Sequence, residues 1–220
     1  LIKDNIKYTA NINNDNFILY KNNIAHNTKI KAVRLSEVTP YYERNQTSIS
    51  KKTVKKWLNL IKEMNANTII IPYIESPNFY QSIYEYNLEN DPIYIIHEIE
   101  IDTKIAKTSY NLYDEKVYND LYERVKRTID VVHGRKLLLN NKKSHTGLYL
   151  ADISNYTIGY IVGTDISQQI VAITNHENDT NTSYNGKYFS VTNGSPFECL
   201  MSEILDNAYK YELNKYKTSK

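Results

Sequence analysis

Apolar side chains recur along the chain with two different spacings. Between Ser50 and Met64 they lie three and four positions apart, which predicts an amphipathic helix that begins after Ser50. The next run, Asn67–Ile74, is almost continuously apolar. Such a run is typical of a strand that is buried on both faces of a parallel sheet. These two stretches therefore predict a helix that leads into a buried strand.

The same pattern predicts three more strands. They are the apolar or β-branched runs Lys29–Val38, Pro92–Ile101 and Asp152–Asp165. The last of these, DISNYTIGYIVGTD, is broken by two glycines and ends on a carboxylate. Weak alternation among the first 27 residues predicts a short β lead-in of one or two strands or a hairpin.

Three more helices are predicted from their first and last residues. Ser76 and Pro77 are the N-cap and first-turn residues of one helix. A longer helix begins at Asp114 and ends near Gly134. The last begins at Ser195, where Glu198 has the spacing of a capping box.

Strands and helices thus alternate, and this order predicts a parallel sheet with right-handed crossovers. Glycine-rich phosphate-binding motifs are absent from the strand-to-helix turns, which argues against a nucleotide-binding fold. We predict an α/β protein with a partial parallel (β/α) barrel of about four βα units. The predicted parts are a β lead-in (1–27), the partial barrel (28–212) and a polar tail (213–220).

Composition limits the classes of function. Of the 220 residues, 27 are basic and 25 acidic, so no strong net field favours nucleic acid as a partner. A single cysteine excludes an internal disulfide, and no apolar run is long enough to span a membrane. We expect a soluble domain. Because the chain begins with Leu1 and shows no signal peptide, we also expect it to be a piece of a longer protein.

Several stretches together resemble a known family. They are KAVRLSEVTPYY, VKKWLNLIKEMNANTIIIPYIESPNFYQSIYEYN, PIYIIHEIEID, DISNYTIGYIVGTDIS and YNGKYFSVTNGSPFECLMSEILDNAYKYE. This set is similar to the N-terminal half of bacterial glycoside-hydrolase-like (β/α)8 domains, related to the glycosidase clan that contains families 2 and 5. The resemblance spans residues 28 to 212 and implies a domain that acts on or recognises a carbohydrate. It also implies attachment to the cell envelope through a larger parent protein.

The resemblance places Asp165 where the clan has its general acid/base, at the end of the fourth strand. The clan uses a glutamate there, one methylene longer, and its nucleophile follows a strand that this chain does not contain. Glycosidases need two carboxyl groups, and barrel sites form at the carboxyl ends of the strands. By position, the partner carboxylate is Glu37 or Glu98, with Glu75 and Glu100 as further candidates.

Four other residues are candidates for binding the sugar. The imidazole of His97 could donate to a hydroxyl or tune a carboxylate, and Arg34 could orient an acid. The rings of Tyr73 and Tyr188 could form platforms for pyranose faces. Ordinary structural roles, as a core histidine, an internal ion pair and packed rings, remain the alternative for each of them.

We expect no cofactor and no metal, because the five histidines lack the spacing of metal ligands. The basic stretch from Arg135 to His145 could contact an anionic glycan or phosphate, although a solvated loop is the simpler reading. The alternative function is a non-catalytic half-barrel that binds glycan or self-associates, because an open four-stranded sheet leaves its edges exposed.

Overall fold

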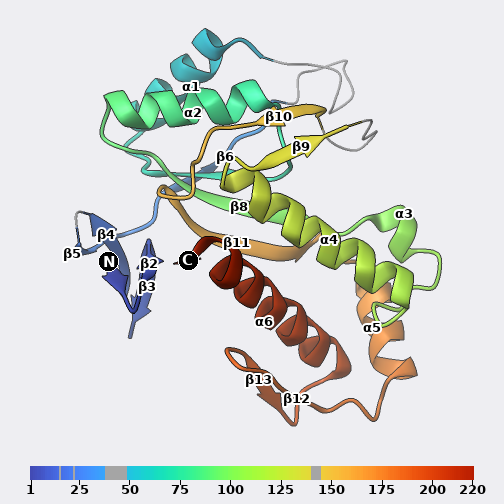
Figure 1. Cartoon of the computed structure of the whole chain (residues 1–220). Coiled ribbons are helices and arrows are strands. Elements are labelled where there is room, and N and C mark those ends of the chain that lie inside the picture. Colours follow the sequence, from blue (N-terminus) through green and yellow to red (C-terminus); the bar gives the residue numbers. More distant parts are fainter. Residues whose placement is uncertain (15, 22, 38–48, 140–144) are drawn as a thin grey trace. The chain divides into compact units, whose positions relative to one another are not determined.

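The computed structural model describes residues 1–220 except 15, 22, 38–48 and 140–144 (Figure 1). The chain forms two compact units. The first comprises residues 1–98, 127–160 and 218–220, and the second comprises residues 99–126 and 161–217.

The central element of the fold is a four-stranded parallel sheet with the strand order β11-β8-β7-β6. Its strands are β6 (Ala32–Arg34), β7 (Thr68–Ile71), β8 (Tyr94–Glu100) and β11 (Thr157–Thr164). In register, Arg34 lies opposite Ile70, and Ile71 lies opposite His97. The predicted mixed α/β fold with a parallel sheet is confirmed. Among the described residues these strands do not close into a barrel.

Two predicted helices cover the sheet in the first unit. Helix α1 (Lys51–Glu63) is capped by Ser50 and helix α2 (Pro77–Glu89) by Ser76, as the sequence predicts. The two helices lie side by side in Figure 1. Their inner faces and strands β7 and β8 form the main hydrophobic core, whose largest members include Tyr80 and Tyr149.

The fourth strand starts later than predicted. Asp152 forms an isolated antiparallel bridge with His133, and residues 154–156 form a turn. The Asp152 carboxylate accepts a hydrogen bond from the backbone N–H of Ser154 at the start of this turn. Strand β11 then begins at Thr157. The first strand is also shorter than predicted: β6 covers only three residues, and Val38 lies outside the described part of the chain.

The long predicted helix is α4 (Glu115–Val132), and it follows a short helix, α3 (Thr103–Ala106). Gly134 follows α4 with φ 62°, the left-handed conformation that was expected to end this helix. A Cβ atom on this glycine would lie 2.6 Å from the backbone oxygen of Leu150. The residue is therefore fixed as glycine both by conformation and by space.

After Gly134 the chain forms an antiparallel pair, β9 (Lys136–Leu138) and β10 (Gly147–Tyr149). This pair belongs to the first unit and was not predicted. Its two faces are both apolar. Leu138 and Tyr149 are buried on the inner face, and four exposed leucines continue the outer face: Leu137, Leu139, Leu148 and Leu150.

Besides α3 and the first part of α4, the second unit contains helices α5 and α6 and a hairpin. Helix α5 (Gln168–Glu177), which the sequence did not predict, precedes the hairpin of β12 (Ser183–Asn185) and β13 (Ser190–Thr192). The last helix, α6 (Pro196–Tyr216), begins with the predicted capping box of Ser195 and Glu198. It extends to Tyr216, through part of the predicted polar tail.

Small strands complete the first unit. Strands β3 (Ala10–Asn13), β4 (Asn16–Lys21) and β5 (Ile24–Asn27) form a meander. Strands β1 (Ile2–Lys3), β2 (Ile6–Tyr8) and β14 (Thr218–Ser219) form a second small sheet, so the end of the chain is paired and buried rather than a free tail. Within the described residues, no helix combines the length and the apolar character that crossing a membrane requires.

Candidate functional site

The carboxyl ends of β6, β7 and β8 bring two groups of polar side chains together in the first unit. One group is partly exposed and consists of Arg34, Tyr73 and Glu98. The other is buried and consists of Glu37, Glu75 and His145. The carboxyl edge of a parallel sheet is where α/β proteins place ligand sites.

The partly exposed group joins three residues that the sequence proposed separately. Arg34 ends β6, and its Nη2 donates a 2.7 Å hydrogen bond to Glu98 Oε2 on β8. The guanidinium carbon lies 6.0 Å from the ring centroid of Tyr73, which is at the limit of a cation–π contact. The Arg34 side chain is 55% exposed, so this group faces solvent.

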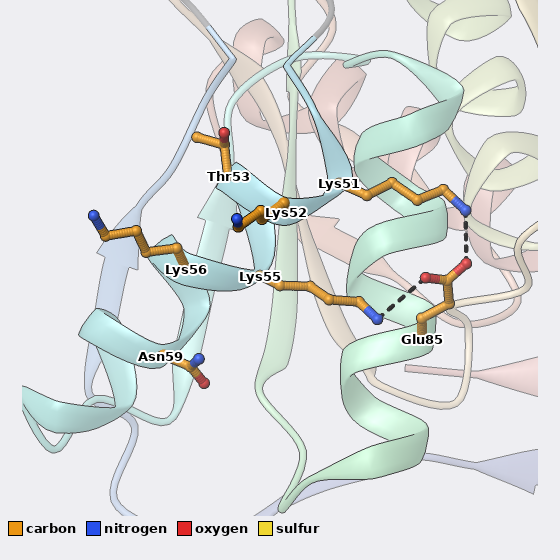
Figure 2. Close-up of a pocket in the computed structure, with 7 residues that line it drawn as sticks. All are labelled: Lys51, Lys52, Thr53, Lys55, Lys56, Asn59 and Glu85. Atoms are coloured by element: carbon orange, nitrogen blue, oxygen red, sulfur yellow. Dashed lines mark hydrogen bonds and ion pairs between the residues drawn. The ribbon is translucent and has the colours of Figure 1, made fainter.

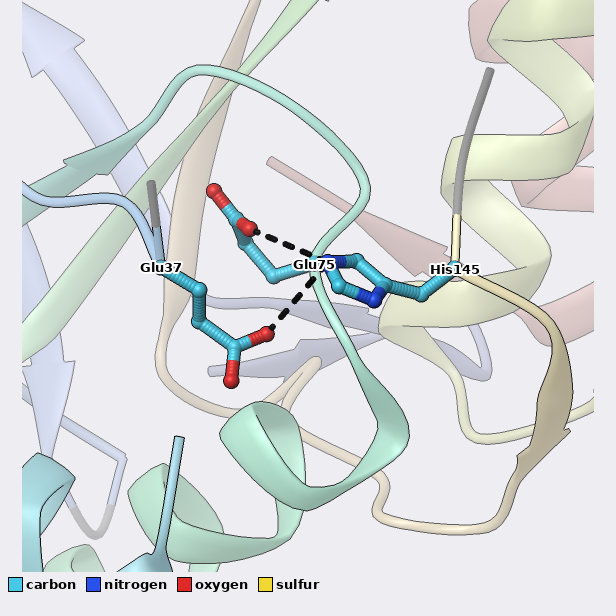
Figure 3. A group of neighbouring side chains, drawn as sticks. All are labelled: Glu37, Glu75 and His145. Atoms are coloured by element: carbon cyan, nitrogen blue, oxygen red, sulfur yellow. Dashed lines mark ion pairs between the residues drawn. The ribbon is translucent and has the colours of Figure 1, made fainter. Parts of the chain in front are cut away.

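The buried group is drawn in Figure 3, where the two carboxyl groups and the imidazole point toward one another. His145 Nε2 lies 3.7 Å from Glu37 Oε2 and 3.8 Å from Glu75 Oε2. One ligand atom from each residue lies within 4.8 Å of the others. The three residues come from three segments: the ends of β6 and β7, and the residues just before β10.

Glu37 is held by the start of helix α2. Its Oε2 accepts from the backbone N–H of Ser76 at 2.6 Å, and its Oε1 accepts from the Ser76 hydroxyl at 2.8 Å. The backbone N–H of Ile49 also donates to Oε1, at 3.1 Å. Because Ser76 is the N-cap of α2, the Glu37 carboxylate lies at the positive end of the helix dipole, which favours its negative charge.

Tyr149 connects the other two members of the buried group through their backbones. Its hydroxyl is 2.8 Å from the carbonyl oxygen of Glu75 and 3.0 Å from that of His145. Burial, with the nearby carboxyl groups of Glu37 and Glu75, raises the pKa of this hydroxyl well above its ordinary value, so it remains a donor. A rigid core ring therefore fixes the spacing of Glu75 and His145.

His97 lies beside this group but is not part of it. Its Nδ1–H donates to the backbone oxygen of Glu98 at 2.8 Å, so its Nε2 accepts from the hydroxyl of Tyr80, also at 2.8 Å. Burial lowers the pKa of His97 to about 4, so the imidazole is neutral at pH 7. The structure thus places His97 in a core network, away from solvent.

The other two predicted residues belong to the second unit. Asp165 is exposed, directly after β11, with φ 68°. Tyr188 lies in the turn between β12 and β13, where its ring packs 4.4 Å from that of Tyr209. The structure therefore gathers Arg34, Tyr73 and Glu98 in the first unit, places Glu37 in the buried group of that unit, and places Asp165 and Tyr188 in the second unit.

A surface hollow lies on helix α1 and is bordered by Glu85 of α2 (Figure 2). Its lysines include Lys51 and Lys55, which pair with Glu85 of α2. Hydrogen bonds from these lysines and from Gln81 lower the pKa of Glu85 to about 2. The pairing neutralises part of this basic surface of α1.

His145 is the residue that sequence reasoning missed as a site residue, and Glu75 was only a secondary candidate. Position near the carboxyl end of a predicted strand did single out Glu37 and Glu75. His145 carried no signal of its own, because it follows no predicted strand and lies at the end of a basic stretch.

Comparisons with protein-family models, curated proteins and solved structures found no match to this chain.

Proposed function

We propose that this chain recognises a carbohydrate at the carboxyl edge of its parallel sheet, and that the sheet corresponds to the first half of a glycoside-hydrolase-like (β/α) barrel. The observation that carries the proposal is the convergence of Arg34, Tyr73 and Glu98. Arg34 and Glu98 lie 64 positions apart in the sequence, with Tyr73 between them, yet Arg34 contacts both of the other residues.

The chemistry of this group suits a sugar. The guanidinium group offers several N–H donors, and the carboxylate accepts hydroxyl protons. The neighbouring aromatic ring of Tyr73 provides an apolar face for the C–H groups of a pyranose. Because the Arg34–Glu98 ion pair already fixes the orientation of both polar side chains, little conformational entropy is lost when a ligand binds.

Binding to immobilised cello-, xylo-, manno- and chito-oligosaccharides tests this proposal. We expect one of them to bind the full chain, and Tyr73→Ala or Arg34→Met to weaken that binding about tenfold or more, which corresponds to about 1.4 kcal/mol. Tyr73→Phe keeps the ring, and Lys52→Met removes a distant charge, so both should bind like the wild type. Equal binding by all variants would exclude this site, and no binding to any of the four would contradict carbohydrate recognition.

Hydrolysis is a further part of the proposal, with Asp165 as general acid/base. The Asp165 carboxylate follows β11, and the carboxyl ends of parallel strands are where barrel enzymes place their reactive groups. If Asp165→Asn cleaves oligosaccharides at the wild-type rate, this role is wrong. The binding experiments with the Tyr73 and Arg34 variants test recognition by the first unit independently.

The outer face of the β9–β10 pair favours a second candidate function, self-association. Leu137 lies opposite Leu148 in register, and both are more than half exposed. Leu139 and Leu150 directly follow the ends of β9 and β10, two positions after these leucines, and are also exposed. An uncharged apolar face is complementary to its own copy, as a two-fold interface requires.

Sedimentation velocity across a range of protein concentrations tests self-association. The wild type should form dimers, and the double variant Leu137→Lys/Leu148→Lys should be monomeric because four like charges would face each other. Leu88→Lys, at an exposed leucine of α2, is the matched control and should dimerise. A wild type that stays monomeric at every concentration would contradict this second function.

A further inference from the structure

We propose that Glu37, Glu75 and His145 bind a divalent transition-metal cation, for which Zn²⁺ is the natural probe. The proposal does not depend on carbohydrate recognition, because it concerns the buried group and not the exposed one. It rests on the charge, the geometry and the support of these three side chains.

Charge is the first argument. Both carboxyl groups have no exposed surface, and His145 is 6% exposed. Burying a charge is unfavourable unless an opposite charge lies close by. A divalent cation between the three side chains would place positive charge beside both carboxylates, and a neutral imidazole would coordinate it.

Geometry is the second argument. The separations of 3.7 and 3.8 Å from His145 Nε2 to the carboxylate oxygens are too long for hydrogen bonds. Two ligands that each lie about 2.1 Å from one tetrahedral Zn²⁺ are about 3.4 Å apart. Small side-chain rotations would therefore bring these atoms into coordination without moving the backbone.

Support around the ligands is the third argument. Metal ligands are usually oriented by outer hydrogen bonds, which fix the ligand atoms before the metal arrives. Here Ser76 holds the Glu37 carboxylate, and Tyr149 holds the backbones of Glu75 and His145. The ligand positions are thus fixed by helix α2 and by a core tyrosine.

The donor atoms indicate the class of metal. One imidazole nitrogen with two carboxylate oxygens suits Zn²⁺ and neighbouring first-row ions better than Ca²⁺ or Mg²⁺, which prefer oxygen ligands alone. Three protein ligands leave at least one coordination position for water or another ligand. No metal is expected from the sequence alone, because the three ligands are too far apart in the chain to form a spacing motif.

The test uses protein from which a chelator has removed all metal. Zn²⁺ is titrated into it in a calorimeter, and Co²⁺ binding is followed by visible absorption. We expect one ion per chain, a rise in melting temperature on Zn²⁺ addition, and a Co²⁺ spectrum of low coordination number. His145→Ala and the near-isosteric Glu75→Gln should each weaken Zn²⁺ binding by about 100-fold or more.

Two controls separate this site from adventitious binding. His26→Ala and His176→Ala remove exposed histidines and should leave affinity, stoichiometry and the Co²⁺ spectrum unchanged. Circular dichroism of metal-free Glu75→Gln establishes that the variant is folded. If the wild type binds no stoichiometric Zn²⁺, or if folded Glu75→Gln binds it equally well, the proposal is overturned whatever the outcome of the oligosaccharide experiments.

Discussion

The hydroxyl oxygen of Tyr80 lies 2.8 Å from Nε2 of His97, and both side chains are buried. The same hydroxyl accepts a 3.3 Å hydrogen bond from the backbone N–H of Glu75. A chain of hydrogen bonds therefore runs from the segment after β7, through helix α2, to strand β8. It requires a neutral His97, because an imidazolium would need an acceptor where the Tyr80 hydroxyl now donates.

We predict that His97 makes the protein less stable in acid. Its pKa is about 4 in the folded state, against an ordinary value of 6.5, so the unfolded chain binds the proton more readily. The free energy of unfolding should thus fall by about 3 kcal/mol as the pH falls from about 6.5 to about 4. Urea unfolding at several pH values measures this slope.

His97→Gln removes the titrating group and should flatten that part of the stability profile, even if the variant is less stable at pH 7. His26→Gln, at an exposed histidine of β5, is the control and should keep the wild-type slope. An unchanged slope in His97→Gln would show that another group causes the acid sensitivity.

We predict that Gly134→Ala is strongly destabilising. The new Cβ would lie 2.6 Å from the oxygen of Leu150, and φ is 62°, so the free energy of unfolding should drop by about 2 kcal/mol or more. Gly159→Ala in β11 is the matched control, because nothing lies within 4 Å of its added Cβ. Chemical denaturation compares the two, and equal effects would contradict the steric argument.

Much of the fold could be predicted because local signals and tertiary packing agree. The caps at Ser50, Ser76 and Ser195 each mark a helix that the structure contains. Helix α5 was missed, although Ser167 caps it. Only two of its ten residues are buried, so the apolar pattern that predicts a helix is weak there. The β9–β10 pair was missed because its strands lack polar alternation: leucines lie on both faces.

The candidate site could be predicted only in part. Position near the carboxyl end of a predicted strand is a local property. It singled out Glu37 and Glu75, which the structure places at one edge of the sheet. The approach of His145 depends on how a separate segment folds back over helix α2, which no local pattern encodes. Likewise, pairing of Arg34 with Glu98 follows from the register of three strands and not from any spacing in the sequence.

We predict that Ser195→Ala lowers the free energy of unfolding by about 1 kcal/mol. The Ser195 hydroxyl oxygen accepts from the backbone N–H of Glu198, and the Glu198 carboxylate accepts from the backbone N–H of Ser195. Each side chain accepts a hydrogen bond from the backbone N–H of the other residue. The double variant Ser195→Ala/Glu198→Ala should therefore lose less free energy of unfolding than the sum of the losses in the two single variants. Ser202→Ala, inside the same helix, is the control for urea denaturation, and additive losses would argue against a reciprocal cap.

We predict that Asp206 holds the turn between β12 and β13 in the second unit. Its Oδ1 accepts from the backbone N–H groups of Tyr188 at 2.6 Å and Phe189 at 3.1 Å. Burial alone would raise the pKa of this carboxyl, but Lys210 and the backbone donors outweigh it and hold the pKa well below the ordinary value. The carboxylate is therefore charged at pH 7, and its stabilising effect should be lost only as the pH falls below about 4.

Asp206→Ala should speed hydrogen exchange of the Tyr188 and Phe189 amides by about 10-fold to 100-fold, because hydrogen bonds to a charged acceptor contribute about 1.5–3 kcal/mol. Lys210→Met removes the ion-pair partner but leaves both backbone bonds in place, so it should affect these amides much less. Amides of β7 in the first unit serve as an internal reference and should be unchanged in both variants. Slow exchange at Tyr188 and Phe189 in Asp206→Ala would show that packing of Tyr188 on Tyr209, and not the carboxylate, holds the turn.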